Sequence, residues 1–187
     1  DEENSHLIFG PVSEKRWVYA VSKLAGEHLM ISEGDAQGMA VTCMRPFNVY
    51  GPGQVGEGAI SNFCRALVAE QPLKIYHGGK DIRSWCFVDD LVDAVASVLY
   101  NPTAFGKSFN IGNPSTSCDT LELANKLIKI NGNGRMEHFE SGHVPIHNRI
   151  PKVDLATKTF GFTPKINLEE GLIRTLAWFK NIENGDL

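Results

Sequence analysis

The sequence predicts an α/β protein, and three observations support this class. Helical and strand-like apolar patterns alternate along all 187 residues. Two short apolar runs, at 40–44 and 108–111, have the composition of buried parallel strands. Hydrophobic residues make up 42% of the chain and charged residues 21%, which is ordinary for a globular protein. The length suits one good domain, since about 100–200 residues per domain is typical.

Apolar spacing and turn residues locate the elements in order along the chain. The predicted helices lie at 15–32, 59–70, 89–99, 119–131, 154–161 and 167–180. The predicted strands lie at 40–44, 73–76, 82–88, 108–112 and 135–139, with a loop at 47–58.

Local signals fix several of these boundaries. The first helix is expected to pack through a face that carries Val21, Leu24, Ala25 and Leu29. The strand predicted at 40–44 is expected to stop at Arg45 and Pro46, because proline cannot donate to a strand ladder. Caps are expected at the start of four later helices, and glycines are expected to end two of these. The capping residues are Asp89 or Asp90, Asp119 with Glu122, Asp154, and Asn167 with Glu170; the glycines are Gly132 and Gly161.

Composition excludes several classes of function. The net charge is −4 without a Lys/Arg cluster, so no nucleic-acid partner is expected. No apolar run approaches the ~18 residues of a membrane span, and residues 1–4 are acidic where a secretory signal is basic. The cysteines are widely spaced and without C-x-x-C, which predicts reduced, largely buried thiols in a cytoplasmic protein. They are Cys43, Cys64, Cys86 and Cys118.

The histidines do not predict a metal site. His143 and His147 have helical spacing, but Pro145 lies between them and works against a shared helix face. No metal is therefore expected.

Tyr19 and Lys23 form the strongest local indication of chemistry. They lie four residues apart in the first predicted helix, so both side chains project from one face. A nearby ammonium favours the phenolate, which suits a tyrosine that gives and takes a proton near neutral pH. The alternative is an ordinary surface pair, and the spacing alone does not exclude it.

A G-x-G-x-x-G pattern at residues 51–56 has a different interpretation. Residues 47–50 separate its first glycine from the preceding strand, and the next helix begins only after Gly58. A dinucleotide fingerprint instead places its glycines in a tight turn that opens directly into a helix. We therefore expect a flexible loop at the mouth of a pocket.

Four motifs in order resemble the extended short-chain dehydrogenase/reductase family that modifies nucleotide sugars. They are Y-x-x-x-K at 19–23, R-P-x-N-x-Y-G-P at 45–52, R-x-x-x-x-V-x-D-x-x-x-A at 83–94 and N-x-G at 110–112. The resemblance extends from about residue 5 to 179. It implies NAD as a tightly held, recycled cofactor, a UDP-sugar as substrate, and a homodimer for the full-length enzyme.

The resemblance also implies roles for individual residues. Tyr19 is expected to be the acid/base, and Lys23 to contact the nicotinamide ribose. The nicotinamide is expected to lie against Pro46, Phe47, Asn48 and Val49. The nucleotide sugar is expected to contact Asn48, Leu73, Ile75, Tyr76, Arg83 and Arg149, with the two arginines on its phosphates.

Two parts of the family pattern are not found in this sequence: the glycine-rich first βαβ turn and the Ser/Thr that precedes the tyrosine. Both are expected upstream of residue 1. The resemblance therefore implies the C-terminal part of a Rossmann-like fold with a small α/β substrate-binding subdomain. Residues 1–58 would belong to the Rossmann-like part, and residues 59–187 mainly to the subdomain. The segment 88–112 would return to the Rossmann-like sheet.

Three functions remain open. The first is a 4-epimerase or dehydratase that works through a transient 4-keto sugar. The second is an oxidative UDP-glucuronate decarboxylase, which the opening residues resemble, although arginines that those enzymes carry would fall at Gly58 and Asp154. The third is a catalytically incomplete fragment or paralogue that only binds nucleotide sugars.

Overall fold

The computed structural model describes residues 2, 5, 7–15, 17–140, 147–183 and 185. His143 and Pro145, and with them the expectation about that histidine pair, lie outside these residues. The helices are α1 Trp17–Gln37, α2 Ala59–Val68, α3 Val88–Leu99, α4 Thr120–Asn131, α5 Asp154–Phe160 and α6 Leu168–Glu183. The strands are β1 Thr42–Pro46, β2 Val49–Tyr50, β3 Leu73–Tyr76, β4 Ile82–Arg83, β5 Cys86–Phe87, β6 Lys107–Ile111, β7 Cys118–Asp119, β8 Met136–Phe139 and β9 Asn148–Arg149.

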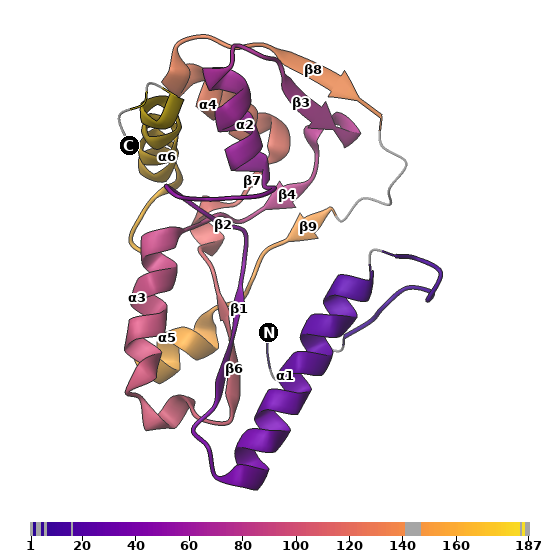
Figure 1. Cartoon of the computed structure of the whole chain (residues 1–187), viewed down its shortest axis with the longest axis vertical. Coiled ribbons are helices and arrows are strands. Elements are labelled where there is room, and N and C mark those ends of the chain that lie inside the picture. The colour runs from indigo at the N-terminus through magenta and orange to yellow at the C-terminus, as the bar shows by residue number, and fades with distance from the viewer. Residues whose placement is uncertain are drawn as a thin grey trace.

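The chain forms two stacked units (Figure 1). In the lower unit, the parallel pair β1–β6 lies between α1 on one side and α3 with α5 on the other. In the upper unit, α2, α4 and α6 pack beside the parallel pair β3–β8. Between them lie the parallel pair β2–β5 and the three-stranded sheet β7–β4–β9. The mixed α/β class with parallel strands is confirmed, whereas the boundary at residues 58 and 59 stays a prediction.

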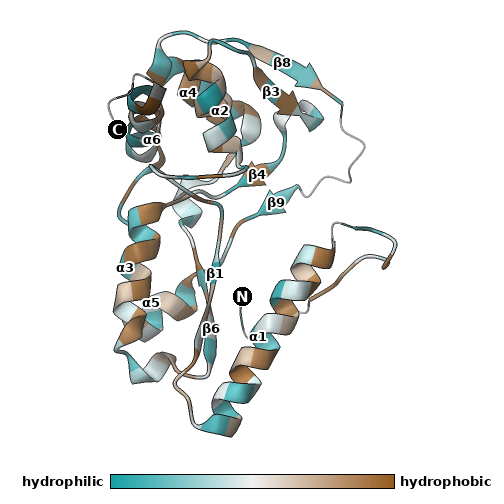
Figure 2. Ribbon diagram, in the orientation of Figure 1, coloured by the Kyte–Doolittle hydropathy of each residue, from teal (hydrophilic) through white to brown (hydrophobic). Residues whose placement is uncertain are grey.

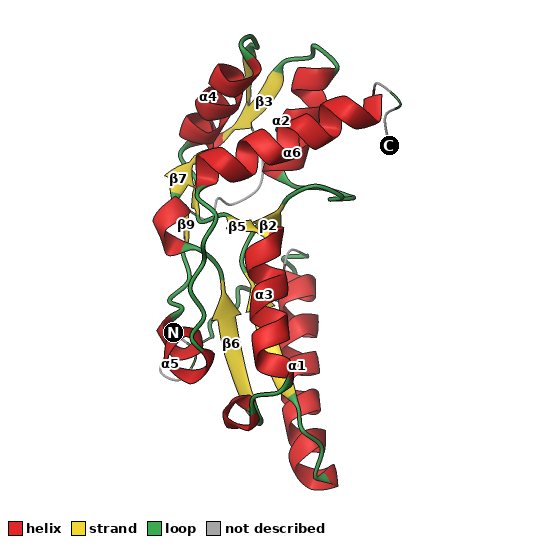
Figure 3. Ribbon diagram, turned by 90° about the vertical axis from the view of Figure 1, so that its left-hand side faces the viewer, coloured by secondary structure: helices red, strands yellow, loops and turns green. Residues whose placement is uncertain are grey.

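Each unit has its own apolar core. The upper core is larger and draws on all three helices of that unit. Its fully buried members include Ile60, Cys64, Leu73, Ile75, Leu123, Leu127 and Leu172. The lower core lies between β6, α3 and α5 and contains Ala94, Val98, Ala104, Phe109, Ile111, Ala156 and Phe162. Figure 3 shows α6 crossing the upper unit above α3.

Several predicted boundaries are confirmed by capping geometry. The Asp119 carboxylate accepts the N–H of Glu122 at 2.7 Å, and the Asn167 side chain accepts that of Glu170 at 2.9 Å. Gly132 and Gly161 end their helices with φ of 87° and 73°, in the left-handed region that glycine adopts without a Cβ penalty.

Other boundary predictions were wrong. The first helix continues through Gly34, the one residue in it that is buried. The strand predicted at 40–44 instead runs from Thr42 to Pro46. Pro46 is tolerated there as the last residue of β1, and the next amide, of Phe47, donates to Ile111 O at 2.8 Å. The face predicted for α1 is also split: Leu24 is half-buried while Val21, Ala25 and Leu29 are exposed.

Two predicted caps and one strand also differ. Neither Asp89 nor Asp90 caps α3, which begins at Val88 after Phe87. The buried Asp90 carboxylate instead accepts the backbone N–H groups of residues 165 and 166, at 2.8 and 3.3 Å. Asp154 lies within the first turn of α5 and does not cap it. The predicted strand 82–88 is divided into β4 and β5, which pair in different sheets.

The four cysteines are free, as predicted. Cys64, Cys86 and Cys118 are buried, while Cys43 is half-buried. Burial raises the pKa of the Cys64 and Cys86 thiols to about 12 and that of Cys118 to about 11, so these three are protonated at neutral pH. Within the described part of the chain, no helix is long and apolar enough to cross a membrane.

Candidate active site and nucleotide pocket

Tyr19 and Lys23 lie together on an exposed face of α1. The Tyr19 side chain is 70% exposed. The Lys23 Nζ lies 5.4 Å from the centroid of the Tyr19 ring, within the range of a cation–π contact. The structure therefore brings the two predicted dyad members into contact through the ring face. Their predicted role in catalysis stays a prediction.

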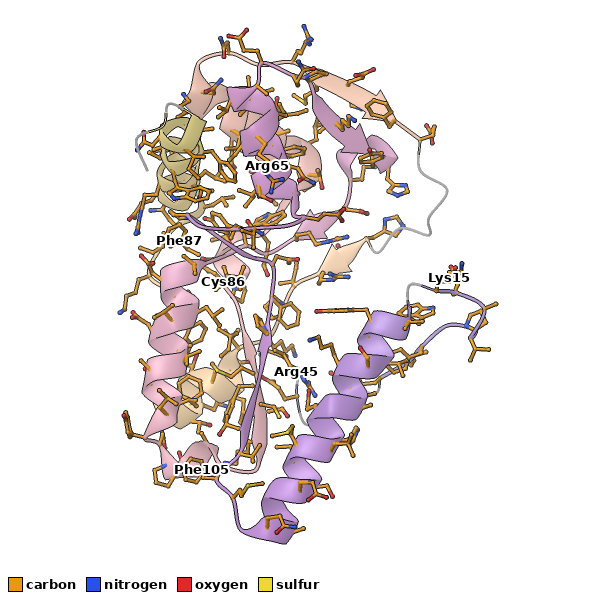
Figure 4. The ribbon with its side chains drawn as sticks, in the orientation of Figure 1. Lys15, Arg45, Arg65, Cys86, Phe87 and Phe105 are labelled. Carbon is orange, nitrogen blue, oxygen red and sulfur yellow. The ribbon has the colours of Figure 1, made fainter. Side chains whose placement is uncertain are left out.

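Arg45, the first residue of the R-P-x-N motif, is held by α1. Its Nε and Nη2 donate to the two carboxylate oxygens of Glu27 at 2.8 and 2.5 Å, and Glu27 also accepts the hydroxyl of Ser108 at 2.6 Å. The hydrogen bond from Arg45 holds the pKa of the Glu27 carboxyl below its ordinary value, against the opposing effect of burial. Figure 4 shows Arg45 projecting from β1 into the space before α1. This ion pair joins the helix of the dyad to the central strands.

The turn after β1 connects that strand to the upper unit. Asn48 has a φ of 43°, in the left-handed region where asparagine is among the favoured residues. Its side-chain amide donates to Ser84 O at 2.8 Å, and its own carbonyl accepts the N–H of Cys86 at 3.2 Å. A Cβ on Gly112, the glycine of the N-x-G motif, would lie 3.1 Å from Phe47 Cβ, so this turn packs tightly on β6. The turn stands at the carboxyl end of a parallel strand pair, where ligands bind in α/β folds.

A cavity of about 1000 Å³ opens beside this turn, between β3, β4 and α2. Its size is at the upper end of the ~300–1000 Å³ typical of small-molecule sites. It is lined in part by predicted site residues: Asn48, Val49, Tyr76 and Arg83. Further polar side chains that line it are Gln54, Glu57, Asn62, Gln71, Lys74, Asp81, Thr120 and Glu137.

Arg83 and Arg149 are brought side by side by strand register. They face each other across the parallel pair β4–β9, although 66 positions separate them in the sequence. The Arg83 side chain is 16% exposed, and Asp81 Oδ2 lies 3.4 Å from its Nη2. Burial lowers the pKa of Arg83, Asp81 opposes this shift, and the charge of Arg149 adds to it. Arg149 is exposed and does not line the cavity in this structure. The sequence named both arginines without any indication of this pairing.

Strand β3 presents its predicted site residues on two different faces, and their role in substrate binding stays a prediction. Leu73 and Ile75 are fully buried in the upper core, so their side chains do not reach the cavity. Because side chains alternate along a strand, Lys74 and Tyr76 face the cavity instead. The Tyr76 ring, which lines the cavity, lies 5.7 Å from that of Phe139 on β8. The alternation of the sequence L-K-I-Y was a sufficient signal to identify Lys74.

The loop at residues 51–58 lines the cavity through Gln54, Glu57 and Gly58, as predicted for a loop at a pocket mouth. Helix α2 begins at Ala59, three residues after the last glycine of the pattern. Arg65 of α2 donates to the carbonyl of Gly56 at 2.6 Å and so ties the loop to the helix. Arg65 is exposed, and Figure 4 labels it on α2. This geometry supports rejecting the pattern as a dinucleotide fingerprint.

Comparison with known proteins places this arrangement in context. Residues 1–112 match the model of the NAD dependent epimerase/dehydratase family. The UDP-D-apiose/UDP-D-xylose synthase of Oryza sativa subsp. japonica is 29% identical, over 95% of this chain and 51% of the relative. The chain therefore spans about half the length of the curated relatives it matches.

Solved structures share the fold. UDP-glucose 4-epimerase of Thermotoga maritima, solved with UDP-glucose, superposes with a TM-score of 0.83 at 26% identity, over 88% of this chain and 54% of that one. The epimerase Mth375 of Methanothermobacter thermautotrophicus superposes with a TM-score of 0.83 at 29% identity, over 89% and 51%. In both cases the superposition includes most of this chain and about half of the other.

Proposed function

This chain belongs to the NAD-dependent epimerase/dehydratase family, and we propose that it carries the acid/base dyad and the nucleotide-sugar pocket of an enzyme that works at sugar C4. The reaction proposed is a 4-epimerisation or a dehydration through a transient 4-keto sugar. The observation that carries the proposal is the cavity of about 1000 Å³, lined by Arg83 and Tyr76, beside the turn of Asn48.

Tyr19 acts in this proposal as the base and then as the acid. Its phenolic oxygen removes the proton from a sugar hydroxyl during oxidation and returns it during reduction. Lys23 lies on the same helix face, with its Nζ 5.4 Å from the Tyr19 ring centroid, and is the partner proposed for the nicotinamide ribose. NAD, when bound, accepts the hydride and gives it back, which makes it a recycled cofactor.

The residues present suit the nicotinamide end of that cofactor. The exposed pair Tyr19 and Lys23 offers a phenol and an ammonium on one helix face. The turn from Pro46 to Val49 is fixed by backbone and side-chain hydrogen bonds and so gives a rigid wall. We propose that these two surfaces flank the nicotinamide and its ribose.

The substrate proposed is a UDP-sugar. Arg83 and Arg149, side by side on β4 and β9, offer planar donor groups to a diphosphate. Tyr76 lines the cavity with an aromatic ring that suits a flat base. The Thermotoga maritima enzyme was solved with UDP-glucose, which supports the same class of substrate.

Oxidative decarboxylation of UDP-glucuronate is the second candidate. It is favoured by similarity to the UDP-D-apiose/UDP-D-xylose synthase of rice, because forming a pentose from a hexuronic acid removes the carboxyl group. Against it, the nearest arginine of α2, Arg65, is engaged with Gly56 and Asn62 and does not line the cavity. A binding-only protein is the remaining, non-enzymatic alternative.

We also propose that the intact enzyme is a homodimer that associates through α1. Val18, Val21 and Leu29 recur along one exposed face of this helix, and the apolar bands of α1 are visible in Figure 2. An exposed apolar stripe of this kind is typical of protein interfaces. The molecular mass in solution, measured by light scattering, tests this point.

The reaction can be tested directly. The intact enzyme is incubated with NAD and separate UDP-sugars, and each product is identified by mass spectrometry and NMR. A product of unchanged mass and inverted C4 supports epimerisation, loss of water supports dehydration, and loss of carbon dioxide supports the second candidate. Binding without any product supports the non-enzymatic alternative.

A further inference from the structure

Four ionisable side chains meet where β4 and β9 lie side by side (Figure 1). Arg83 is in register with Arg149, so two positive charges are neighbours. Asp81 precedes β4, and its Oδ2 lies 3.4 Å from Arg83 Nη2. Its Oδ1 lies 3.8 Å from Nδ1 of His147, the residue before β9. One carboxylate therefore stands between an arginine and a histidine.

The Asp81 carboxylate has few and long hydrogen-bonding contacts in this position. Its side chain is 20% exposed, and its Oδ1 is buried without a hydrogen-bond partner among the described residues. The contact of 3.8 Å with His147 is an ion pair only when the imidazole is protonated, and it is too long for a hydrogen bond. The contact of 3.4 Å with Arg83 is also long. A carboxylate held this loosely is easily drawn toward a stronger partner.

Asp81 also lines the cavity together with Arg83. Under the function proposed above, Arg83 must receive the phosphates of a diphosphate at this place. A carboxylate beside the same guanidinium opposes that binding in two ways: it occupies a donor of Arg83, and it repels an incoming anion.

We propose that Asp81 competes with the diphosphate of the nucleotide sugar for Arg83, and that protonation of His147 draws the carboxylate away and strengthens binding. This inference rests on the proposed function, because it takes Arg83 as a phosphate ligand. Asp81 is then a residue that sets the affinity of the pocket, and His147 makes this affinity depend on pH.

His147 is well placed to be the group that changes charge. Histidine is the side chain that ordinarily gains its proton between about pH 5 and 8. The other charged groups that face the cluster from neighbouring elements are carboxylates, a lysine and arginines. They are Arg83 on β4, Arg149 on β9, Asp119 on β7 opposite Ile82, Lys74 and Glu137 in register on β3 and β8, and Glu57 of the cavity loop.

Two other histidines lie near the cavity and serve to separate this effect from a general one. His77 follows Tyr76 directly after β3, and His138 lies on β8. Because side chains alternate along a strand, His138 faces away from the cavity that Glu137 lines. It is therefore the matched control for His147.

The test is calorimetric binding of UDP-glucose to the intact protein at about pH 5.5 and pH 8, on either side of the ordinary histidine range. UDP-glucose is chosen because its diphosphate is a diester that keeps its charge between these values. The variants are Asp81→Asn, His147→Gln and Arg83→Gln. The controls are His138→Gln and Asp93→Asn, the latter a carboxylate that pairs with Lys165 at the surface.

We expect the unmodified protein to bind about three- to tenfold more tightly at the lower pH, the size expected for a charge change close to an anion. Asp81→Asn should bind about three- to tenfold more tightly than the unmodified protein at pH 8 and lose the pH dependence. His147→Gln should bind UDP-glucose at both pH values as weakly as the unmodified protein does at pH 8. The two controls should behave as the unmodified protein does.

The outcomes separate the two proposals. If Arg83→Gln leaves affinity unchanged, or UDP-glucose does not bind at all, the proposed phosphate site is wrong and this inference is overturned with it. If Arg83→Gln weakens binding but Asp81→Asn does not tighten it, only the inference about Asp81 is wrong. Weaker binding by Asp81→Asn would show that Asp81 supports Arg83. Unchanged pH dependence in His147→Gln overturns the role of that histidine.

Discussion

The two units of this molecule differ in how completely they bury their apolar side chains. In the upper unit, helices α2 and α4 each bury a stripe that meets β3, and residues such as Leu123 and Leu127 are fully enclosed. In the lower unit, helix α1 buries only Gly34 over its 21 residues, and strand β1 is half-buried. Figure 2 shows apolar bands along α1.

This difference in burial coincides with the proposed separation of substrate binding from proton transfer. The cavity and Arg83 belong to the upper unit and the strands joined to it, which have a closed core behind them. Tyr19 and Lys23 belong to α1, which is tied to the central strands by the Glu27–Arg45 pair. Substrate affinity should therefore depend on a rigid surface, whereas proton transfer should depend on a helix whose packing is less complete.

The largest expected effect comes from a substitution in the dyad, which tests whether proton transfer and substrate binding are separate. Tyr19→Phe removes the proposed acid/base oxygen from α1 and leaves the cavity of the upper unit unchanged. Turnover by the intact enzyme should fall by about 10²–10⁴, the usual contribution of a general acid/base, while UDP-sugar affinity should stay the same. Initial rates and calorimetric binding measure the two quantities. Unchanged turnover would return Tyr19 to the interpretation as a surface residue.

The next effect compares one substitution in both units. Leu127→Ala opens a cavity in the closed upper core, because Leu127 is fully buried. It should lower the free energy of unfolding by about 2–5 kcal/mol. Leu99→Ala changes the same side chain in the lower unit, at the last residue of α3, where it is 60% exposed, and should shift the free energy of unfolding by less than about 0.5 kcal/mol. Urea unfolding followed by circular dichroism measures both, and similar losses would contradict the contrast between the units.

Features fixed by neighbours in the sequence could be predicted. The pair Tyr19 and Lys23 needs only helical spacing, and the start of α4 needs only Asp119 three residues before Glu122. The motif arginines could be named as candidate site residues only through the family resemblance. Their neighbouring positions could not be predicted, because these depend on the parallel pairing of β4 with β9.

The failures have a common physical origin in distant partners. The strand predicted at 82–88 is interrupted because Thr116, 31 positions away, takes over the backbone of Trp85: it accepts its N–H at 2.9 Å and donates to its carbonyl at 2.7 Å. Asp90 has the composition of a cap, yet it is buried and accepts N–H groups from the segment before α6.

The smallest expected effect concerns the ion pair that joins α1 to the central strands. Glu27→Gln removes a carboxylate that accepts two hydrogen bonds from Arg45 and one from Ser108. At neutral pH it should lower the free energy of unfolding by about 1–2 kcal/mol, as for hydrogen bonds to charged groups.

The pH dependence of this loss follows from the lowered pKa of Glu27. Because the pKa in the folded state lies below the ordinary value of 4.5, the carboxylate stabilises the fold fully above that value, and its contribution is lost as the pH falls through the lowered pKa. The two proteins should therefore converge in stability as the pH falls below 4.5, and urea unfolding at a series of pH values measures this. The matched control is Glu122→Gln, whose partner Lys126 lies at 3.2 Å on the exposed face of α4; it should cost no more than about 0.5 kcal/mol. An equal loss in both variants would mean that α1 is held to the strands by its apolar contacts and not by this ion pair.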